Sequence, residues 1–428
     1  MRARSISIID SNLIQKSYLL SFYLLCIAIF LPYQLAINIA IALLIVVWLI
    51  EGNFRIKLKK FISSPLAIAS VLLFLLYVCG LLYSNNIEAG SKYLETKASL
   101  LIFPVILSTA TLTKEYIIKT IYFFAGCCLL FSLIALLYQI KVVQDLDDVN
   151  YLFSDGLVLI YSKQAVYYSM YVAFSILVLL DKFWKERSIR LTIRKAIYIV
   201  AIGFLLLFLF LLASRTSLIA LVMIVVSTAI VIGAQKGNLK SAVFVVCSLI
   251  LFFSLLSFFF PQTLARFSSL GNLSFDFHNQ ASEYHFAFVN AENSWNGLNL
   301  RLAKWICAID VIKQYPWIGV GTGDIKDELV KAYIERGFIY GAEKRFDPHN
   351  QFFETAVGIG FAGLIVLCFF YFNALYEAIK SKHWLFTAFL LLIIFCSLTE
   401  SVLSSSQGII FICFFVFIFT RLIEVAEQ

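Results

Sequence analysis

Long apolar runs separated by short polar segments make up most of this chain. Runs such as residues 203–210 contain no polar side chain, whereas the strands of a membrane β-barrel alternate apolar and polar residues. Because a helix needs about 20 apolar residues to cross a bilayer core, the pattern predicts about 12 transmembrane helices. Their expected bounds are 17–33, 35–50, 65–83, 98–112, 117–140, 164–180, 196–213, 216–234, 241–260, 351–373, 384–399 and 405–421.

The composition agrees with this pattern. Of the 428 residues, 61% are hydrophobic and only 14% are charged, whereas soluble domains contain about 25% charged residues. The fold class we predict is therefore an all-α polytopic membrane protein. The net charge of +8 comes largely from basic residues in loops 51–64 and 181–195. These residues form no continuous basic face, so we expect no nucleic-acid partner.

The same basic loops predict the orientation in the membrane. Basic residues concentrate in cytoplasmic loops, so loops 51–64 and 181–195 are expected inside and the acidic loop 141–163 outside. Twelve crossings then place both termini in the cytoplasm and segment 261–350 outside. The first apolar run is interpreted as an uncleaved helix, since no small-residue cleavage site follows it.

Three regions follow from this layout. Residues 1–260 are predicted to form an N-terminal membrane bundle, 261–350 one large external loop, and 351–428 the C-terminal membrane helices. Within the loop, residues 261–297 show no period. Apolar residues then recur at helical spacing from Leu298 to about Gln314, and a second helix is expected to begin at Asp324. Both helices are amphipathic, with apolar faces suited to the bundle or the lipid boundary.

Ionisable residues are almost absent from the predicted spans, where each costs about 2.5–3.5 kcal/mol on insertion scales. This argues against an ion-coupled transporter, which needs such groups near the membrane midplane. The exceptions are expected to gather at the external ends of the spans. These residues, which predict a site at the external surface, are Arg215, Arg301, His349, Glu354 and Glu400.

Each of these residues also has a structural interpretation. Arg215 lies in a very short turn between two spans, where it could contact lipid phosphates or bind an anion at the helix N-terminus that follows. Arg301 stands beside Lys304 on an amphipathic helix and could belong to a solvated face. His349 can accept or donate a proton near neutral pH, and Asn350 can cap the following helix.

No metal or cofactor is expected. Asp145 and Asp147 resemble the paired aspartates that hold a metal in many glycosyltransferases, but an acidic external loop often contains this spacing by chance. The glycines of segment 319–323 follow no strand, as a phosphate-binding loop would require, and are interpreted as a turn between helices. The nine cysteines show no metal-binding spacing.

Several motifs resemble those of the O-antigen ligase and polymerase superfamily of bacterial envelope polysaccharide assembly, in order and in spacing. Most of them lie in the C-terminal half, and segment 161–168 departs from the family pattern, since many relatives have His-Pro before the tyrosine. The matching segments are 97–104 (KASLLIFP), 214–218 (SRTSL), 299–305 (NLRLAKW), 315–323 (YPWIGVGTG), 348–354 (PHNQFFE), 358–364 (GIGFAGL) and 398–401 (LTES).

The resemblance implies transfer of a glycan from undecaprenyl diphosphate to an acceptor on the periplasmic face of the bacterial inner membrane. It also implies that Arg215, Arg301 and His349 are the functional residues. Paired arginines stabilise the charge that develops on a leaving diphosphate, so a metal-independent, inverting transfer is expected. His349 is expected to deprotonate or orient the acceptor hydroxyl, or to contact the diphosphate.

Supporting roles and the acceptor are less defined by the sequence. Glu354, Glu400, Asn350 and Lys304 are expected to help bind substrate. A ligase would attach the glycan to lipid A–core or another terminal acceptor, whereas a polymerase would extend a chain on its own lipid carrier; the ligase is slightly favoured. A transporter of lipid-linked glycan is less favoured, because the chain shows no duplicated halves.

Overall fold

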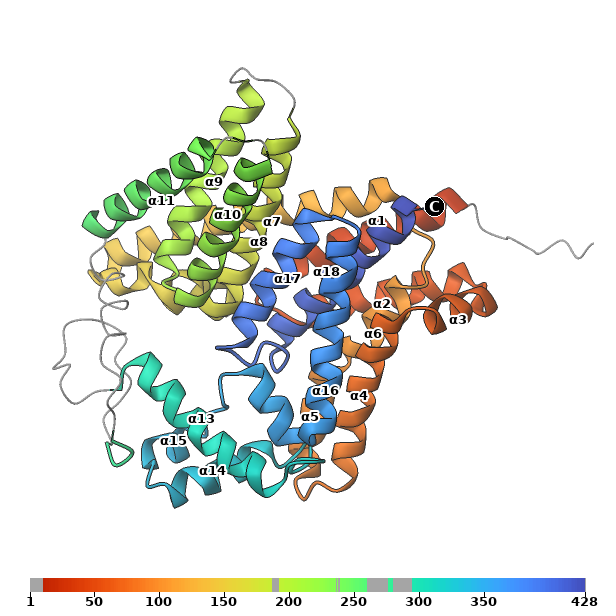
Figure 1. Cartoon of the computed structure of the whole chain (residues 1–428), viewed down its shortest axis with the longest axis vertical. Helices are drawn as coiled ribbons and strands as arrows, with labels where there is room; N and C mark the ends of the chain where they lie inside the picture. Colours follow the sequence, from red (N-terminus) through yellow and green to blue (C-terminus); the bar gives the residue numbers. More distant parts are fainter. Residues whose placement is uncertain are drawn as a thin grey trace, which may run out of the picture.

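The computed structural model describes residues 11–186, 192–235, 237, 239–259, 276–279 and 295–427. Throughout these residues the regular structure is helical, with no β-strand, which confirms the predicted all-α class. The membrane helices and the helices of the loop are shown in Figure 1.

The helices of the N-terminal region alternate long apolar and short polar elements. The first group is α1 (Ser11–Ala28), α2 (Gln34–Glu51), α3 (Phe54–Ile62), α4 (Pro65–Leu82), α5 (Ile87–Lys97), α6 (Ser99–Leu107) and α7 (Lys114–Leu146). Two 3-10 helices, η1 (Val149–Leu152) and η2 (Ser154–Tyr161), then precede α8 (Ala165–Lys185), α9 (Ile193–Leu211), α10 (Arg215–Gln235) and α11 (Lys240–Phe259).

The remaining helices belong to the loop and to the C-terminal region. The loop contains α13 (Gly297–Gln314), α14 (Ile325–Glu335) and α15 (Ile339–Lys344). The C-terminal helices are α16 (Gln351–Lys380), α17 (Trp384–Ser397) and α18 (Ser406–Glu427).

Nine helices in the described part of the chain are long and apolar enough to cross a membrane, so the chain is a multi-pass membrane protein. Nine of the predicted spans coincide with them: α2, α4, α7, α8, α9, α10, α11, α16 and α18. The other three predicted spans fall on α1, on the nine-residue α6 and on the 14-residue α17. These helices are shorter or less apolar than the rest.

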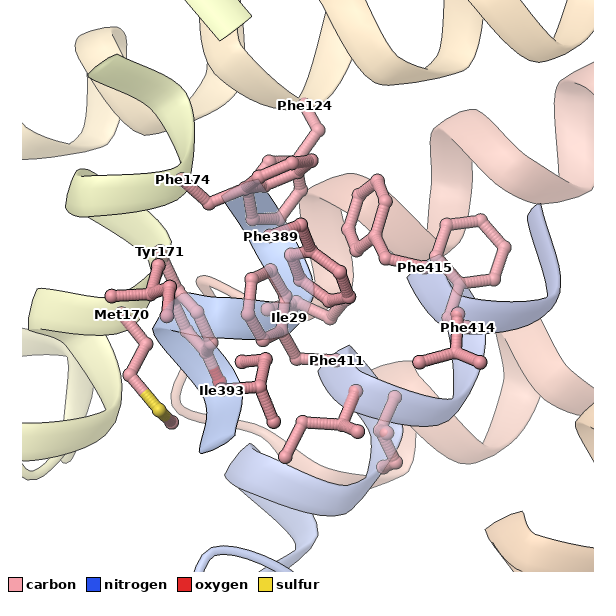
Figure 2. Close-up of a cluster of buried hydrophobic side chains, with 14 of the residues drawn as sticks. Ile29, Phe124, Met170, Tyr171, Phe174, Phe389, Ile393, Phe411, Phe414 and Phe415 are labelled. Atoms are coloured by element: carbon pink, nitrogen blue, oxygen red, sulfur yellow. The ribbon is translucent and has the colours of Figure 1, made fainter. Parts of the chain in front are cut away.

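Aromatic side chains join the two membrane regions at the centre of the bundle (Figure 2). The centre of the Phe415 ring on α18 lies 4.8 Å from the ring centres of Phe124 on α7 and Phe174 on α8. The ring centres of Phe174 and Phe389 on α17 are 4.9 Å apart. Such pairs contribute about 0.5–1.5 kcal/mol beyond the area they bury. The last helix is thus a central element of the bundle.

The loop helices form a second, smaller core. Asn296 caps α13 by accepting hydrogen bonds from the N–H groups of Leu298 and Asn299, at 3.0 and 2.8 Å, and the helix ends before Pro316. Buried Trp295 and Tyr333 pack on Phe338. Figure 1 shows α13, α14 and α15 lying together at one end of the molecule. Both amphipathic helices predicted in the loop are confirmed.

The glycine turn 319–323 packs against a break in α16. At Ile359 and Gly360 the backbone leaves the helical conformation, and the segment after α13 supplies replacement hydrogen bonds. The Phe361 N–H donates to Pro316 O at 2.8 Å, and the Val320 N–H donates to Val357 O at 2.9 Å. Irregular backbone within a membrane helix is tolerated where protein groups satisfy it in this way. The turn therefore fastens the loop to α16, as a connection between helices.

Most of the segment predicted to be irregular, 261–297, lies outside the described residues, and so does His285. Residues 276–279 are described, and His278 is exposed there, with its ring against Gly337. The acidic loop is shorter than expected, because α7 continues to Leu146 and η1 and η2 follow it.

Candidate active site

Arg215 is the first residue of α10, directly after the tight connection from α9. The connection is closed by Ala213, whose φ of 51° lies in the left-handed region that residues with a side chain rarely adopt. The hydroxyl of Thr216 lies 2.8 Å from that of Thr399. This contact joins the start of α10 to residues 398–405, which connect α17 to α18 and are called the α17–α18 turn below.

Arg301 reaches the same turn from α13. Its Nε donates to Thr399 O at 3.1 Å, and its Nη2 donates to Glu400 Oε1 at 2.5 Å. A third, longer bond runs from Nη1 to Gly297 O at 3.4 Å. The guanidinium is therefore held by main-chain and carboxylate oxygens while a quarter of the side chain (25%) stays exposed.

His349 stands directly before α16 and lies between two carboxylates. Its Nδ1 is 2.7 Å from Glu400 Oε2, and its Nε2 is 3.1 Å from Asp347 Oδ1. Its φ of 47° is left-handed, a conformation that costs energy and that clusters at functional sites. The two carboxylates thus hold this imidazole in a defined position.

Asn350 has two roles at this point. Its Oδ1 caps α16 by accepting from the N–H groups of Phe352 and Phe353, at 2.9 and 3.1 Å. Its Nδ2 donates to Leu398 O at 2.9 Å. The predicted capping role is confirmed, and the same side chain also fastens the start of α16 to the α17–α18 turn.

Glu400 is the common partner of Arg301 and His349. Burial by itself would raise the pKa of this carboxyl group, but the charges and hydrogen bonds of His349 and Arg301 outweigh burial and hold the pKa at about 2. Glu400 is therefore a carboxylate at neutral pH, with each oxygen on a different partner.

These side chains surround one cavity of about 280 Å³. Arg215, Arg301, His349 and Glu400 all line it, so the structure brings together four of the residues singled out in the sequence. The full lining is Ser154, Asp155, Gln164, Ala165, Val166, Leu212, Ala213, Ser214, Arg215, Thr216, Ser217, Arg301, His349, Cys396 and Glu400.

Residues 200–368 of this chain match the family model for O-antigen ligase. The resemblance to the O-antigen ligase and polymerase superfamily is confirmed. No curated protein sequence matches this chain at a significant level. The matched region is less than half of the chain, and it contains Arg215, Arg301 and His349. Members of this superfamily are membrane enzymes that act on lipid-linked glycans, as ligases or polymerases.

Three of the residues expected to help bind substrate lie outside the lining of the cavity: Asn350, Glu354 and Lys304. Glu354 is 2% exposed on α16 and accepts a short hydrogen bond from the Tyr93 hydroxyl. Lys304 is also 2% exposed, with its ammonium 3.9 Å from the centre of the Phe346 ring. Direct contact of Asn350, Glu354 or Lys304 with a substrate in this cavity is therefore not supported by their positions.

The cavity contains residues that the sequence reasoning missed. Asp155 on η2 is exposed at the cavity, and its Oδ1 accepts from the Ala165 N–H at 2.6 Å. Gln164 lies beside it, and its N–H donates to Gln407 Oε1 at 3.3 Å. Asp155 was recognised only as one acid of an acidic loop. Asp347 lies outside the cavity lining but contacts His349; its place two residues before His349 is the signal that points to it.

The paired aspartates of the acidic loop do not join this site. Asp145 lies in the last turn of α7, and Asp147 follows the helix in a left-handed conformation. Within the described ranges, no three His, Cys, Asp or Glu side chains gather as metal ligands would. The cationic groups at the cavity are arginines.

Proposed function

We propose that this protein transfers a glycan from a polyprenyl diphosphate, of the undecaprenyl type, to a hydroxyl group of an acceptor, with inversion at the anomeric carbon. The observation that supports this most is the cavity that brings Arg215, Arg301 and His349 together. It provides two groups for the leaving diphosphate and one for the acceptor proton.

The diphosphate is assigned to the two arginines. Guanidinium groups bind phosphate oxygens through paired N–H donors, and Arg215 also stands at a helix N-terminus, where the helix dipole favours anions. Arg301 is held by Thr399 O and Glu400, which fixes its direction before substrate arrives. Preorganised donors of this kind stabilise the charge that develops in the transition state.

The acceptor is assigned to His349. A neutral imidazole donates from only one nitrogen, so Nδ1–H can donate to Glu400 while Nε2 accepts the proton of the acceptor hydroxyl. The hydroxyl then takes the place of Asp347, which faces Nε2 in this structure. Glu400 stabilises the imidazolium that forms, as an orienting carboxylate does in other acid–base pairs.

The steps balance without a further reactant. The acceptor O–H bond breaks, its proton passes to His349 Nε2, and the oxygen attacks the anomeric carbon from the face opposite the diphosphate. The bond from that carbon to the phosphate oxygen breaks, and its electron pair stays on the leaving diphosphate. We assign the sugar hydroxyls to the exposed carboxylate of Asp155 and the amide of Gln164, which line the same cavity.

A ligase and a polymerase would share this chemistry and differ only in the acceptor, so the test must separate the two. A deletion strain is complemented with wild type or with His349→Ala, and lipid-linked glycan is separated from acceptor-linked glycan. With His349→Ala, a ligase leaves long chains on the lipid carrier, whereas a polymerase leaves single repeat units already joined to the acceptor. We favour the ligase, with lipid A–core or another terminal acceptor. A wild-type profile from His349→Ala would contradict the proposed site.

A further inference from the structure

A lysine outside the lining of the cavity contacts the α17–α18 turn, and the proposed chemistry does not use it. Lys97 ends α5 and its side chain is fully buried (0% exposed). Its ammonium donates to Leu403 O at 2.8 Å and lies 3.3 Å from the Ser404 hydroxyl. It also lies 4.8 Å from the centre of the Tyr77 ring and 4.5 Å from that of Tyr93.

A buried ammonium is expensive unless it is hydrogen-bonded and compensated by charge. Here the compensation comes from main-chain and hydroxyl oxygens, from two aromatic faces and from the carboxylate of Glu354 nearby. Burial lowers the pKa of Lys97, to about 8, so at neutral pH the side chain remains mostly a charged donor. The group is therefore fitted to hold an oxygen in place.

The oxygen that Lys97 holds belongs to the segment that carries Glu400. The same turn is held next to this point by Gln351, whose Oε1 accepts from the Leu403 N–H at 2.6 Å. The Tyr93 hydroxyl lies 3.0 Å from that of Ser404. Leu403 therefore has both its main-chain N–H and its main-chain oxygen fixed by buried side chains.

On the cavity side, the turn positions the proposed active residues. Thr399 O and Glu400 hold Arg301, and Glu400 also holds His349. A shift of the turn would move both partners of Glu400 together. A displacement of about 1 Å in positioning groups can reduce turnover by about two orders of magnitude.

We propose that Lys97 is a positioning residue: by holding Leu403 O and Ser404, it fixes the α17–α18 turn so that Glu400 orients Arg301 and His349 for glycan transfer. This inference rests on the proposed function. If Lys97 positions the turn, loss of its ammonium changes both turnover and the surroundings of the His349 ring in a protein that remains folded. Loss of a lysine with a purely structural role would change stability alone.

The test uses the full-length protein in nanodiscs and the variant Lys97→Met. Methionine keeps a long, unbranched side chain at this position and removes its charge. Lys92→Met is the matched control, because Lys92 lies on the same helix, is 74% exposed and pairs, in the described part of the chain, with Glu88 one turn earlier. Turnover is measured with lipid-linked glycan donor, and the His349 side chain is followed by nitrogen-15 NMR, with its signal assigned from His349→Ala.

We expect Lys97→Met to lower kcat by about tenfold or more while KM for the donor changes less than about threefold, because Arg215 still holds the diphosphate. The His349 signal should shift or broaden, and Lys92→Met should match wild type in both measurements. A folded Lys97→Met protein with wild-type kcat and an unchanged His349 signal would overturn the proposal.

Two further comparisons allow the proposal to be tested even if Lys97→Met does not fold or the wild-type protein shows no transfer. If Lys97→Met does not fold, Gln351→Leu releases the same turn at the Leu403 N–H, and the same pattern is expected with a smaller loss. A folded Gln351→Leu protein that behaves as wild type would then count against the turn as the positioning element. If wild type itself transfers no glycan, the proposed function fails, while the His349 signal of Lys97→Met still decides the structural part of the inference.

Discussion

Two buried carboxylates in this protein have similar partners and different surroundings. Glu51, at the end of α2, pairs with Lys57 at 2.8 Å, and the two side chains are only 6% and 5% exposed. Glu51 also accepts from the Tyr18 hydroxyl at 2.7 Å and from the Thr111 N–H at 2.8 Å. The partners close around this carboxylate from several elements and fasten α1, α2 and α3 to one another.

Glu400 is equally buried, at 9% exposure of its side chain, but its partners are more open. Arg301 and His349 are 25% and 31% exposed and line a cavity with Arg215. Burial and a short ion pair are therefore not enough to mark a site. What distinguishes the Glu400 cluster is that the partners of the carboxylate also face a space that a substrate can enter.

Transfer should fall most when the two arginines or the histidine of the cavity are replaced. Arg215→Ala, Arg301→Ala and His349→Ala should each lower transfer by about 100-fold or more, since each removes a group that acts in the transition state, while membrane insertion is unchanged. Arg336→Ala is the matched control, because its guanidinium is 46% exposed and paired with Asp310 away from the cavity. Near-normal transfer by all three variants, at equal expression, would show that the Glu400 cluster is no more functional than the Glu51 cluster.

Glu400→Gln should have the next largest effect on transfer. The amide keeps the shape of the side chain but loses the charge that holds Arg301 and stabilises an imidazolium on His349, so a loss of about 10-fold to 100-fold is expected. The rate is measured at saturating donor. A rate equal to wild type would show that Glu400 is as structural as Glu51.

Lys57→Met should reverse this pattern, with a loss of stability and no change in chemistry. Removing one partner of a buried ion pair costs about 3–5 kcal/mol, because Glu51 is left without its countercharge. Thermal or denaturant midpoints are compared with transfer per folded molecule. A selective loss of transfer from Lys57→Met would mean that the two clusters are not functionally distinct.

The pH dependence of stability should separate Glu400 from its amide variant. The pKa of Glu400 is lowered to about 2 in the folded protein, against about 4.3 in an unfolded chain. Its stabilising contribution is therefore fully present above about pH 4.3 and is lost as the pH falls toward about 2. The difference in melting temperature between wild type and Glu400→Gln should be constant at neutral pH and shrink across that acidic range. A constant difference down to pH 2 would contradict the assignment.

The smallest expected effect is that of metal removal. Because arginines are proposed to take the role of a metal ion at the diphosphate, EDTA should leave the transfer rate of the purified protein unchanged. Asp145→Asn should be neutral as well, since this side chain lies on α7 outside the cavity lining. Loss of activity that returns with added Mg²⁺ or Mn²⁺ would refute the arginine-based mechanism.

The sequence predicted the helical class and most membrane helices, because long apolar runs have few other structures open to them in a bilayer. It also indicated that Arg215, Arg301, His349 and Glu400 converge. Ionisable residues are rare near the predicted spans, so their position at one membrane face indicates a shared site. The position of Pro316 and the helical period likewise predicted the end of α13.

What could not be predicted was which groups pair within that face. Asp155 reaches the cavity only because η1 and η2 fold the acidic loop toward α8, and neither short helix has an apolar period. The burial of Lys304 and Glu354 depends on how α13 and α16 pack, which periodicity does not specify. Lys97 was visible as part of a motif, but its bond to Leu403 O joins positions 306 residues apart.

On the proposed mechanism, glycan is transferred at the cavity lined by Arg215, Arg301 and His349. The most direct measurement is single-turnover transfer of labelled glycan from polyprenyl diphosphate by the purified, reconstituted protein, comparing wild type, His349→Ala and His278→Ala. His278 lies in the same loop but is exposed and outside the cavity lining. We expect transfer to be lost in His349→Ala and to be kept in wild type and His278→Ala. Equal single-turnover rates for His349→Ala and wild type would contradict it.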